Sequence, residues 1–233
     1  MILANVRERL SPEDLSFVAD LLARGDVVDC PEELLDEPAL FELLRDAPGI
    51  ASPSAPLFLY VAVRHSLRSV GIDDAELSDY LAALLLEFGM RDRAYRIAPT
   101  DDAVYYYVTD IVADLEADRG QRGLLLRAHL GNYSLWLSGV FPDRITARVA
   151  RAGGPGLGYY EEVGARGFRL AADHALAREW RLSGLYALAA DQFERLRVGL
   201  NRLSDNVFFR NLSSPDRLMR QVGDEMRLFG ETN

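Results

Sequence analysis

The chain has 233 residues, 49% of them apolar, which is enough to bury a hydrophobic core without disulfides or structural metal ions. Its 26 basic residues are all arginine, and 36 acidic residues give a net charge of −10. Because duplex nucleic acid and anionic membrane surfaces are bound by clustered positive charge, we expect this acidic chain to bind neither.

Cysteine content and apolar patterning predict a soluble cytoplasmic protein. The single cysteine, Cys30, cannot form an internal disulfide, which fits a reducing compartment. The apolar stretch at the start is too short for a signal peptide, and acidic residues follow it closely. No run of about twenty uninterrupted apolar residues occurs, so the sequence predicts no transmembrane helix.

The first fifty residues are predicted to form a helical arm. Ser11 followed by Pro12 is typical of a helix start, because the serine caps free backbone N–H groups and proline fits the first turn. A second helix is expected over residues 31–46, broken near Pro38.

A loop over residues 47–56, rich in Pro, Gly and Ser, supplies the best internal boundary. The arm over residues 1–50 is predicted to pack on a main helical domain over 56–233. The alternative is a single domain overall.

The main domain shows helical periodicity throughout. A helix that is apolar on most faces is expected after Pro56, ending at Gly71. The clearest amphipathic stripe follows, with apolar residues at helical spacing. It consists of Leu77, Tyr80, Leu81, Leu84, Leu85 and Phe88.

Helices are then predicted from Thr100, over residues 121–139 and after Pro142. A long helix is expected from Tyr159 to Trp180. Its predicted buried face carries Gly164 and Gly167, and glycines there permit close helix approach.

Two amphipathic helices are expected to complete the chain. One begins at Ser183, and the last begins at Ser214-Pro215. The stripe on the last helix is predicted to contact a second copy or a protein partner, and consists of Leu218, Val222, Met226 and Phe229. In total we expect an all-α, multi-helix bundle of about eight to ten helices with mixed orthogonal packing.

The best candidate site is a polar and aromatic face on the helix over residues 121–139. His129, Asn132, Tyr133 and Trp136 lie at i, i+3, i+4 and i+7, so they share one face in an apolar context. Such a face is suited to lining a ligand pocket. The alternative is a buried polar network that fixes helix packing.

Other patterns give weaker candidates. Buried Arg64 needs an acidic partner, and Glu87 is predicted to supply it. A metal site built from His129, His174, Tyr133 and Glu161 or Glu162 has no supporting sequence spacing, so no metal site is predicted. Acidic residues spaced four apart, from Asp110 to Asp118, superficially resemble the aspartate-rich helices of isoprenoid synthases, but no second acidic motif accompanies them.

The sequence contains no recognisable catalytic motif, so catalytic residues and cofactors stay unknown. We expect a non-enzymatic domain that binds a protein partner or a small apolar ligand, with homodimerisation as one form of that contact. The alternative is an enzyme, or a cofactor- or metal-binding bundle, with a pocket between helices around His129.

Overall fold

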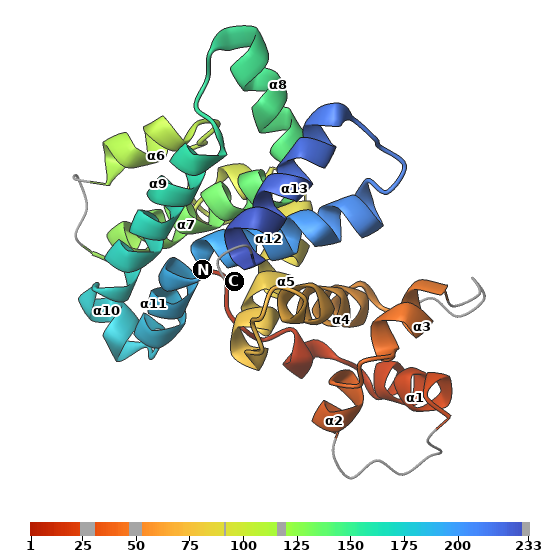
Figure 1. The fold of residues 1–233 in the computed structure, drawn as a ribbon. Coiled ribbons are helices and arrows are strands. Elements are labelled where there is room, and N and C mark those ends of the chain that lie inside the picture. The colour runs from red at the N-terminus through yellow and green to blue at the C-terminus, as the bar shows by residue number, and fades with distance from the viewer. Residues whose placement is uncertain (24–30, 47–52, 91, 116–119, 230–233) are drawn as a thin grey trace. The chain divides into compact units, whose positions relative to one another are not determined.

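The computed structural model describes residues 1–23, 31–46, 53–90, 92–115 and 120–229 (Figure 1). Within these ranges every regular element is a helix and thirteen are α-helices, so the predicted all-α fold class is confirmed. The helices outnumber the eight to ten expected because several predicted helices are split. None of the described helices combines the length and the apolar character needed to cross a membrane.

The chain forms two compact units, residues 2–87 and residues 88–233, and the second also includes Met1. Their boundary falls inside helix α5 (Ala75–Gly89). It does not coincide with the loop over residues 47–56 that we predicted as the boundary, of which residues 47–52 lie outside the described ranges. A separate arm over residues 1–50 stays a prediction.

The first unit begins with a well-capped helix. Ser11 Oγ accepts a hydrogen bond from the backbone N–H of Asp14 at 3.2 Å, and Asp14 Oδ2 accepts one from the N–H of Ser11 at 3.1 Å. The predicted break near Pro38 separates α2 from α3. The helices described in this unit, besides α5, are η1 (Arg7–Arg9), α1 (Pro12–Leu21), α2 (Pro31–Leu35), α3 (Leu40–Asp46) and α4 (Ala55–Arg68).

Helices α4 and α5 supply much of the buried apolar surface of the first unit. The predicted stripe on α5 is buried from Leu77 to Phe88, as expected. Arg64 in α4 is only 5% exposed and pairs with Asp36 at 3.0 Å and Asp73 at 2.5 Å. The prediction of Glu87 as its partner is therefore wrong, because carboxylates before and after α4 reach the guanidinium instead.

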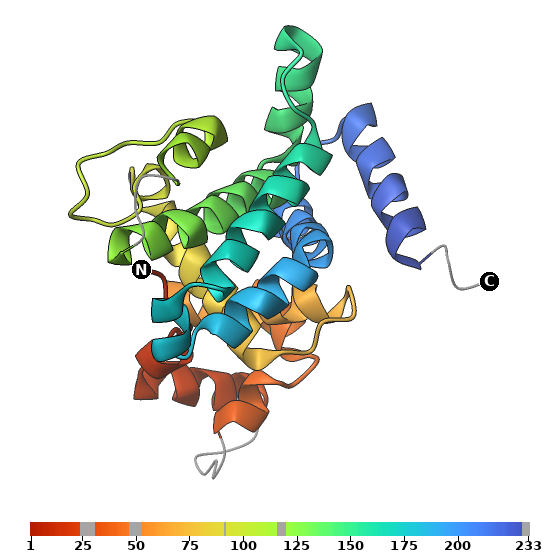
Figure 2. The same ribbon diagram turned by 90° about the vertical axis from the view of Figure 1, so that its left-hand side faces the viewer.

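The second unit is organised around α7 (Gln121–Val140), most of whose residues are buried. Helices α7 and α9 lie side by side, and α12 also packs against α7 (Figures 1 and 2). The other helices described in this unit are η2 (Arg93–Tyr95), α6 (Val108–Asp114), α8 (Pro142–Ala152), α9 (Leu157–Ala172), α10 (Ala175–Glu179), α11 (Ser183–Asp191), α12 (Phe193–Leu203), the π-helix η3 (Ser204–Phe208) and α13 (Pro215–Phe229).

Glycines bring α7 and α9 into backbone contact. A Cβ atom added to Gly167 would lie 2.7 Å from the backbone nitrogen of Gly131 and 3.0 Å from the carbonyl oxygen of Arg127. One added to Gly164 would lie 2.3 Å from the ring of Phe193. The predicted role of Gly164 and Gly167 in close helix approach is confirmed.

The helix expected from Thr100 begins only at Val108. The backbone before it is held in another conformation by local hydrogen bonds. Asp101 Oδ1 accepts from the N–H of Ala103 at 2.8 Å, and the carbonyl of Asp101 accepts from Arg96 at 2.7 Å. Such side-chain bonds compete with helix formation, and the prediction misses this competition.

The long helix expected over residues 159–180 is interrupted between α9 and α10. His174 has extended backbone angles, and its Nδ1 accepts a hydrogen bond from the N–H of Leu176 at 3.2 Å. The hydroxyl of Ser183 donates to the carbonyl of Ala172 at 2.7 Å, which satisfies the end of α9. His174 therefore starts a new helix instead of continuing the old one.

The last helix, α13, turns its charged side toward the unit. Arg217 and Asp224 are 6% and 3% exposed. Ion pairs attach this side to the unit, namely Arg217–Asp143 (2.7 Å), Arg220–Asp205 (2.9 Å) and Arg197–Asp224 (2.7 Å). The apolar stripe predicted on this helix is exposed along its whole length, from Leu218 to Phe229.

Candidate functional site

An aromatic-walled cavity of about 210 Å³ lies in the second unit. Its lining comes from α7, from α8, from η2 and from the segment between η2 and α6. Five aromatic side chains form most of the wall, and these are Tyr95, Tyr106, Tyr107, Tyr133 and Trp136. We call this cavity the aromatic pocket.

Four of these rings form a continuous wall. The ring centres of Tyr95 and Tyr106 are 5.1 Å apart, and those of Tyr95 and Tyr133 are 6.2 Å apart. Trp136 follows at 6.0 Å from Tyr133. Because Tyr133 and Trp136 are three residues apart on α7, they face the pocket together.

Hydrogen bonds hold the irregular segment that completes the wall. The hydroxyl of Tyr133 donates to the carbonyl of Tyr106 at 3.0 Å. The N–H of Tyr105 donates to the carbonyl of Tyr95 at 2.8 Å. Arg122 at the start of α7 donates to the Tyr105 hydroxyl at 2.8 Å. Tyr105 and Tyr106 are therefore both tied to α7, and Tyr105 is also tied to Tyr95 in η2.

Two arginines supply the charge of the aromatic pocket. Arg144 and Arg148 lie four residues apart on α8 and both line the cavity, whose lining holds no carboxylate. In the part of the chain that the structure describes, neither has an ion-pair partner. Asp143 beside them pairs with Arg217, and the Arg148 guanidinium lies 5.6 Å from the centre of the Tyr107 ring.

Of the four residues predicted to form a ligand-binding face, two line the aromatic pocket. Tyr133 and Trp136 do so, whereas His129 and Asn132 do not. The latter two are buried in α7, with 3% and 4% of their surface exposed. Ligand binding by any of the four stays a prediction.

His129 is enclosed by other rings. Its ring centre lies 5.7 Å from that of Phe88, 6.3 Å from Tyr105 and 6.0 Å from Tyr133. Its Nε2 atom is buried without a hydrogen-bond partner. Burial, reinforced by the charge of Arg93, lowers the pKa of His129 to about 3, so the ring is neutral at physiological pH.

Tyr133 is also held in one protonation state. Burial raises the pKa of Tyr133 to about 12, so its hydroxyl stays protonated. A general acid or base works best with a pKa near the working pH. With one pKa far below neutrality and the other far above, neither His129 nor Tyr133 is suited to general acid or base chemistry near neutral pH.

Sequence reasoning missed the charged half of the aromatic pocket. The four-residue spacing of Arg144 and Arg148 just after Pro142 is visible in the sequence. Nothing in that spacing tells which helix or loop the two side chains would face. The contribution of Tyr106 was equally hidden, because its segment was expected to be helical from Thr100.

A larger cavity of about 550 Å³ lies between α6, α7 and α9. Its lining is mostly aliphatic, with Tyr159 as its single aromatic ring and Arg127 and Arg166 as its cations. Arg127 already donates to the carbonyl of Gly123 at 2.7 Å. This cavity therefore offers fewer groups that orient a ligand than the aromatic pocket does.

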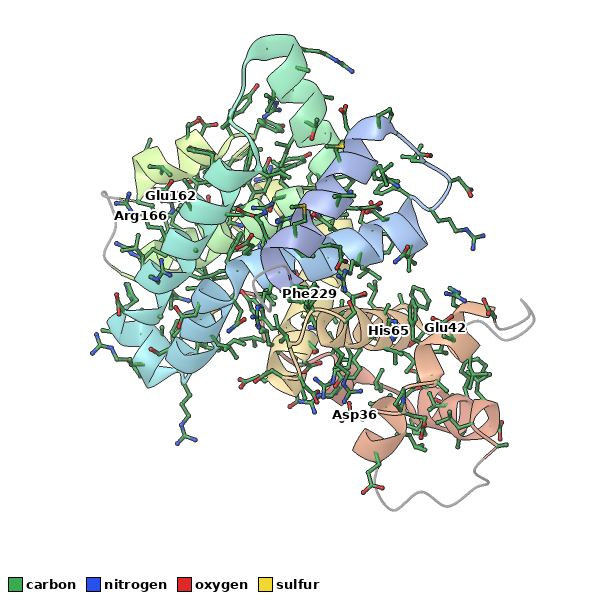
Figure 3. All side chains as sticks on the ribbon, in the orientation of Figure 1. Asp36, Glu42, His65, Glu162, Arg166 and Phe229 are labelled. Atoms are coloured by element: carbon green, nitrogen blue, oxygen red, sulfur yellow. The ribbon has the colours of Figure 1, made fainter. Side chains whose placement is uncertain are left out.

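Within the described ranges no histidine belongs to a metal-ligand cluster. His174 caps α10 through its Nδ1 atom, and Glu161 pairs with Arg197 at 2.7 Å, so both residues of the metal site considered from sequence have other partners. His65 stacks on Phe41 with ring centres 4.3 Å apart, in the unit where Figure 3 labels it. No group of three or more metal-ligating His, Cys, Asp or Glu occurs in the described ranges, from which Cys30 is missing.

Comparison with models of protein families, with curated proteins and with solved structures found no match for this chain.

Proposed function

We propose that this chain is a small-ligand-binding domain and that the aromatic pocket takes a small, flat anion, such as an aromatic carboxylate. The observation that carries this proposal is the placement of two arginines without acidic partners, Arg144 and Arg148, in one cavity with a wall of closely spaced aromatic rings. Guanidinium groups bind carboxylates through paired, charge-assisted hydrogen bonds. Aromatic walls attract a flat ring by offset or edge-to-face stacking.

The size of the cavity supports a one-ring ligand. Pockets for drug-sized molecules hold roughly 300–1,000 Å³, and the aromatic pocket, at about 210 Å³, is smaller. The buried hydroxyl of Tyr133 is already used by the carbonyl of Tyr106. The exposed side chains of Tyr106 and Tyr107 leave the pocket open to solvent on one side, which gives a ligand a route of entry.

Quenching of Trp136 fluorescence by 4-nitrobenzoate tests the proposal. Replacing Trp180 with Phe leaves Trp136 as the sole tryptophan, so the signal reports on the pocket. We expect saturable quenching by 4-nitrobenzoate and at least tenfold weaker binding of the uncharged 4-nitrobenzamide, because one charge-assisted hydrogen bond is worth about 1.5–3 kcal/mol.

Arginine variants provide the matched controls. Arg144→Gln and Arg148→Gln should each weaken 4-nitrobenzoate binding about tenfold. Arg151→Gln on the same helix should leave binding unchanged, because Arg151 does not line the pocket. Equal binding of the acid and the amide, or no saturable quenching, contradicts the proposal.

A second candidate function is contact with another protein chain through α13. It is supported by the exposure of Leu218, Met219, Val222, Met226 and Phe229, which is unusual for an amphipathic helix attached to a folded unit. Light scattering should then detect association, and Val222→Asp should abolish it without changing the melting temperature. A dimer that survives this substitution contradicts the role of α13. Cytoplasmic localisation remains a proposal from the single cysteine.

A further inference from the structure

Helix α13 buries its charged side and exposes its apolar side, which is the opposite of a helix that packs on a hydrophobic core. Its buried side carries Arg217, Arg220 and Asp224, all in ion pairs with the rest of the second unit. The opposite side carries five apolar side chains that are between 46% and 70% exposed, and these are Leu218, Met219, Val222, Met226 and Phe229. We call this second side the apolar stripe. It contributes little to the core of its own unit.

The area of the apolar stripe is close to what one half of a stable dimer needs. Five large side chains at these exposures present roughly 500–600 Å² of apolar surface. Two such stripes facing each other would bury roughly 1,000–1,200 Å², and specific interfaces begin at about 1,000 Å². A second copy of the same helix therefore suffices to cover the stripe.

Charges beside the stripe suit an antiparallel pair. Arg227 pairs with Asp224 at 2.9 Å and Glu194 at 3.1 Å in its own unit, and its side chain is still 51% exposed. Asp216 and Arg227 lie eleven residues apart, about three helical turns, so they fall on the same flank of α13. In an antiparallel pair, Asp216 of one copy faces Arg227 of the other, at both ends. In a parallel two-fold pair the two flanks lie on opposite sides of the contact, so this pairing of Asp216 with Arg227 is absent.

We infer that the occupant of the apolar stripe is the α13 helix of a second copy of this chain, packed antiparallel about a two-fold axis near Val222. This inference rests on the proposed contact through α13. Leu218 of each copy would then lie against Met226 of the other. The contact is isologous, so it closes at two copies.

Analytical ultracentrifugation of the full chain tests the occupant. We expect a dimer, and at least a hundredfold weaker dimerisation in Val222→Asp. Val149→Asp is the matched control, because Val149 is 39% exposed on α8 and lies outside the stripe. A monomer at tens of micromolar overturns the inference and leaves the aromatic-pocket proposal standing.

Cysteine cross-linking tests the direction. In a Cys30→Ser background, Val222→Cys should oxidise to a covalent dimer, because disulfides need Cα atoms within about 7 Å. Leu218→Cys alone should not cross-link, whereas a mixture of Leu218→Cys and Met226→Cys chains should. A dimer in which Leu218→Cys cross-links with itself overturns the antiparallel arrangement while the proposed contact through α13 survives.

Discussion

The guanidinium of Arg197 donates two hydrogen bonds, of 2.7 and 2.8 Å, to the carboxylate of Asp224, and Arg197 is fully buried. The same guanidinium donates to Glu161 at 2.7 Å and to Asn201 at 2.8 Å. Asn201 in turn donates to the carbonyls of Ser138 and Gly139 in α7. This one arginine thus joins four helices of the second unit.

Removing the carboxylate at position 224 should unfold or detach α13. Asp224→Asn leaves the buried charge of Arg197 with Glu161 as its remaining carboxylate, and breaking a buried pair in this way costs about 3 kcal/mol. Urea unfolding followed by circular dichroism measures the loss. Glu225→Gln, which removes the exposed partner of Arg202, should cost less than about 1 kcal/mol. Equal losses in the two variants would contradict the central role of Arg197.

A methyl group at the α7–α9 contact should force the helices apart. Gly167→Ala places its Cβ against the backbone of α7, and overpacking of this kind costs about 1–3 kcal/mol, more than alanine's helix propensity returns. Gly158→Ala on the same helix meets nothing within 4 Å and should be neutral or slightly stabilising. Chemical denaturation measures the free energy of unfolding of both variants. A Gly167→Ala protein as stable as the wild type would refute the close contact.

Acid should destabilise the protein in part through His129. Its pKa is about 3 in the folded state and about 6.5 in the unfolded state, so between these values only the unfolded chain takes up the proton. Stability therefore falls as the pH falls from about 6.5 to about 3, by up to about 1.4 kcal/mol per pH unit from this residue. Urea unfolding at pH 7, 6 and 5 measures the slope.

A phenylalanine at the same position should remove this acid dependence. His129→Phe also eliminates the unpaired Nε2 atom, so stability at pH 7 should be retained or raised. Tyr133→Phe, which removes a hydroxyl with a pKa of about 12, is the control and should keep the wild-type slope. If His129→Phe shows an unchanged slope, His129 is not the buried neutral group described above.

Loosening the segment before α6 should weaken the aromatic pocket. Arg122 bonds both the Tyr105 hydroxyl and Asp101, at 2.8 and 3.1 Å, so Arg122→Gln removes an anchor of the wall. We expect a stability loss of about 1 kcal/mol, faster hydrogen exchange over residues 96–107 and several-fold weaker 4-nitrobenzoate binding. Arg166→Gln is the control. Exchange that stays as slow as in the wild type would contradict the anchoring role.

The fold could be predicted where one physical signal dominates. The stripe from Leu77 to Phe88 is buried as its periodicity requires, and Gly164 and Gly167 sit at a close helix contact. Predictions failed where a side chain competes with the helix for backbone hydrogen bonds. Asp101 delays the start of α6, and His174 ends the helix that we expected to continue to residue 180.

The candidate site was only half predictable for a different reason. Tyr133 and Trp136 share a face because helical spacing is local, so the sequence places them together. Arg148 on α8 meets Tyr107 only through the contact of α8 with a segment forty residues earlier in the chain. Contacts over such separations depend on tertiary structure, and a single sequence carries no direct signal of them.

The buried neutral state of His129 and Tyr133 leaves the electrostatics of the aromatic pocket to Arg144 and Arg148. Guanidinium groups keep their positive charge throughout the biological range of acidity. A ligand in the aromatic pocket would therefore meet the same positive charge in mildly acidic and in mildly alkaline solution. If acid releases the ligand, the cause would be protonation of the ligand's own anionic group.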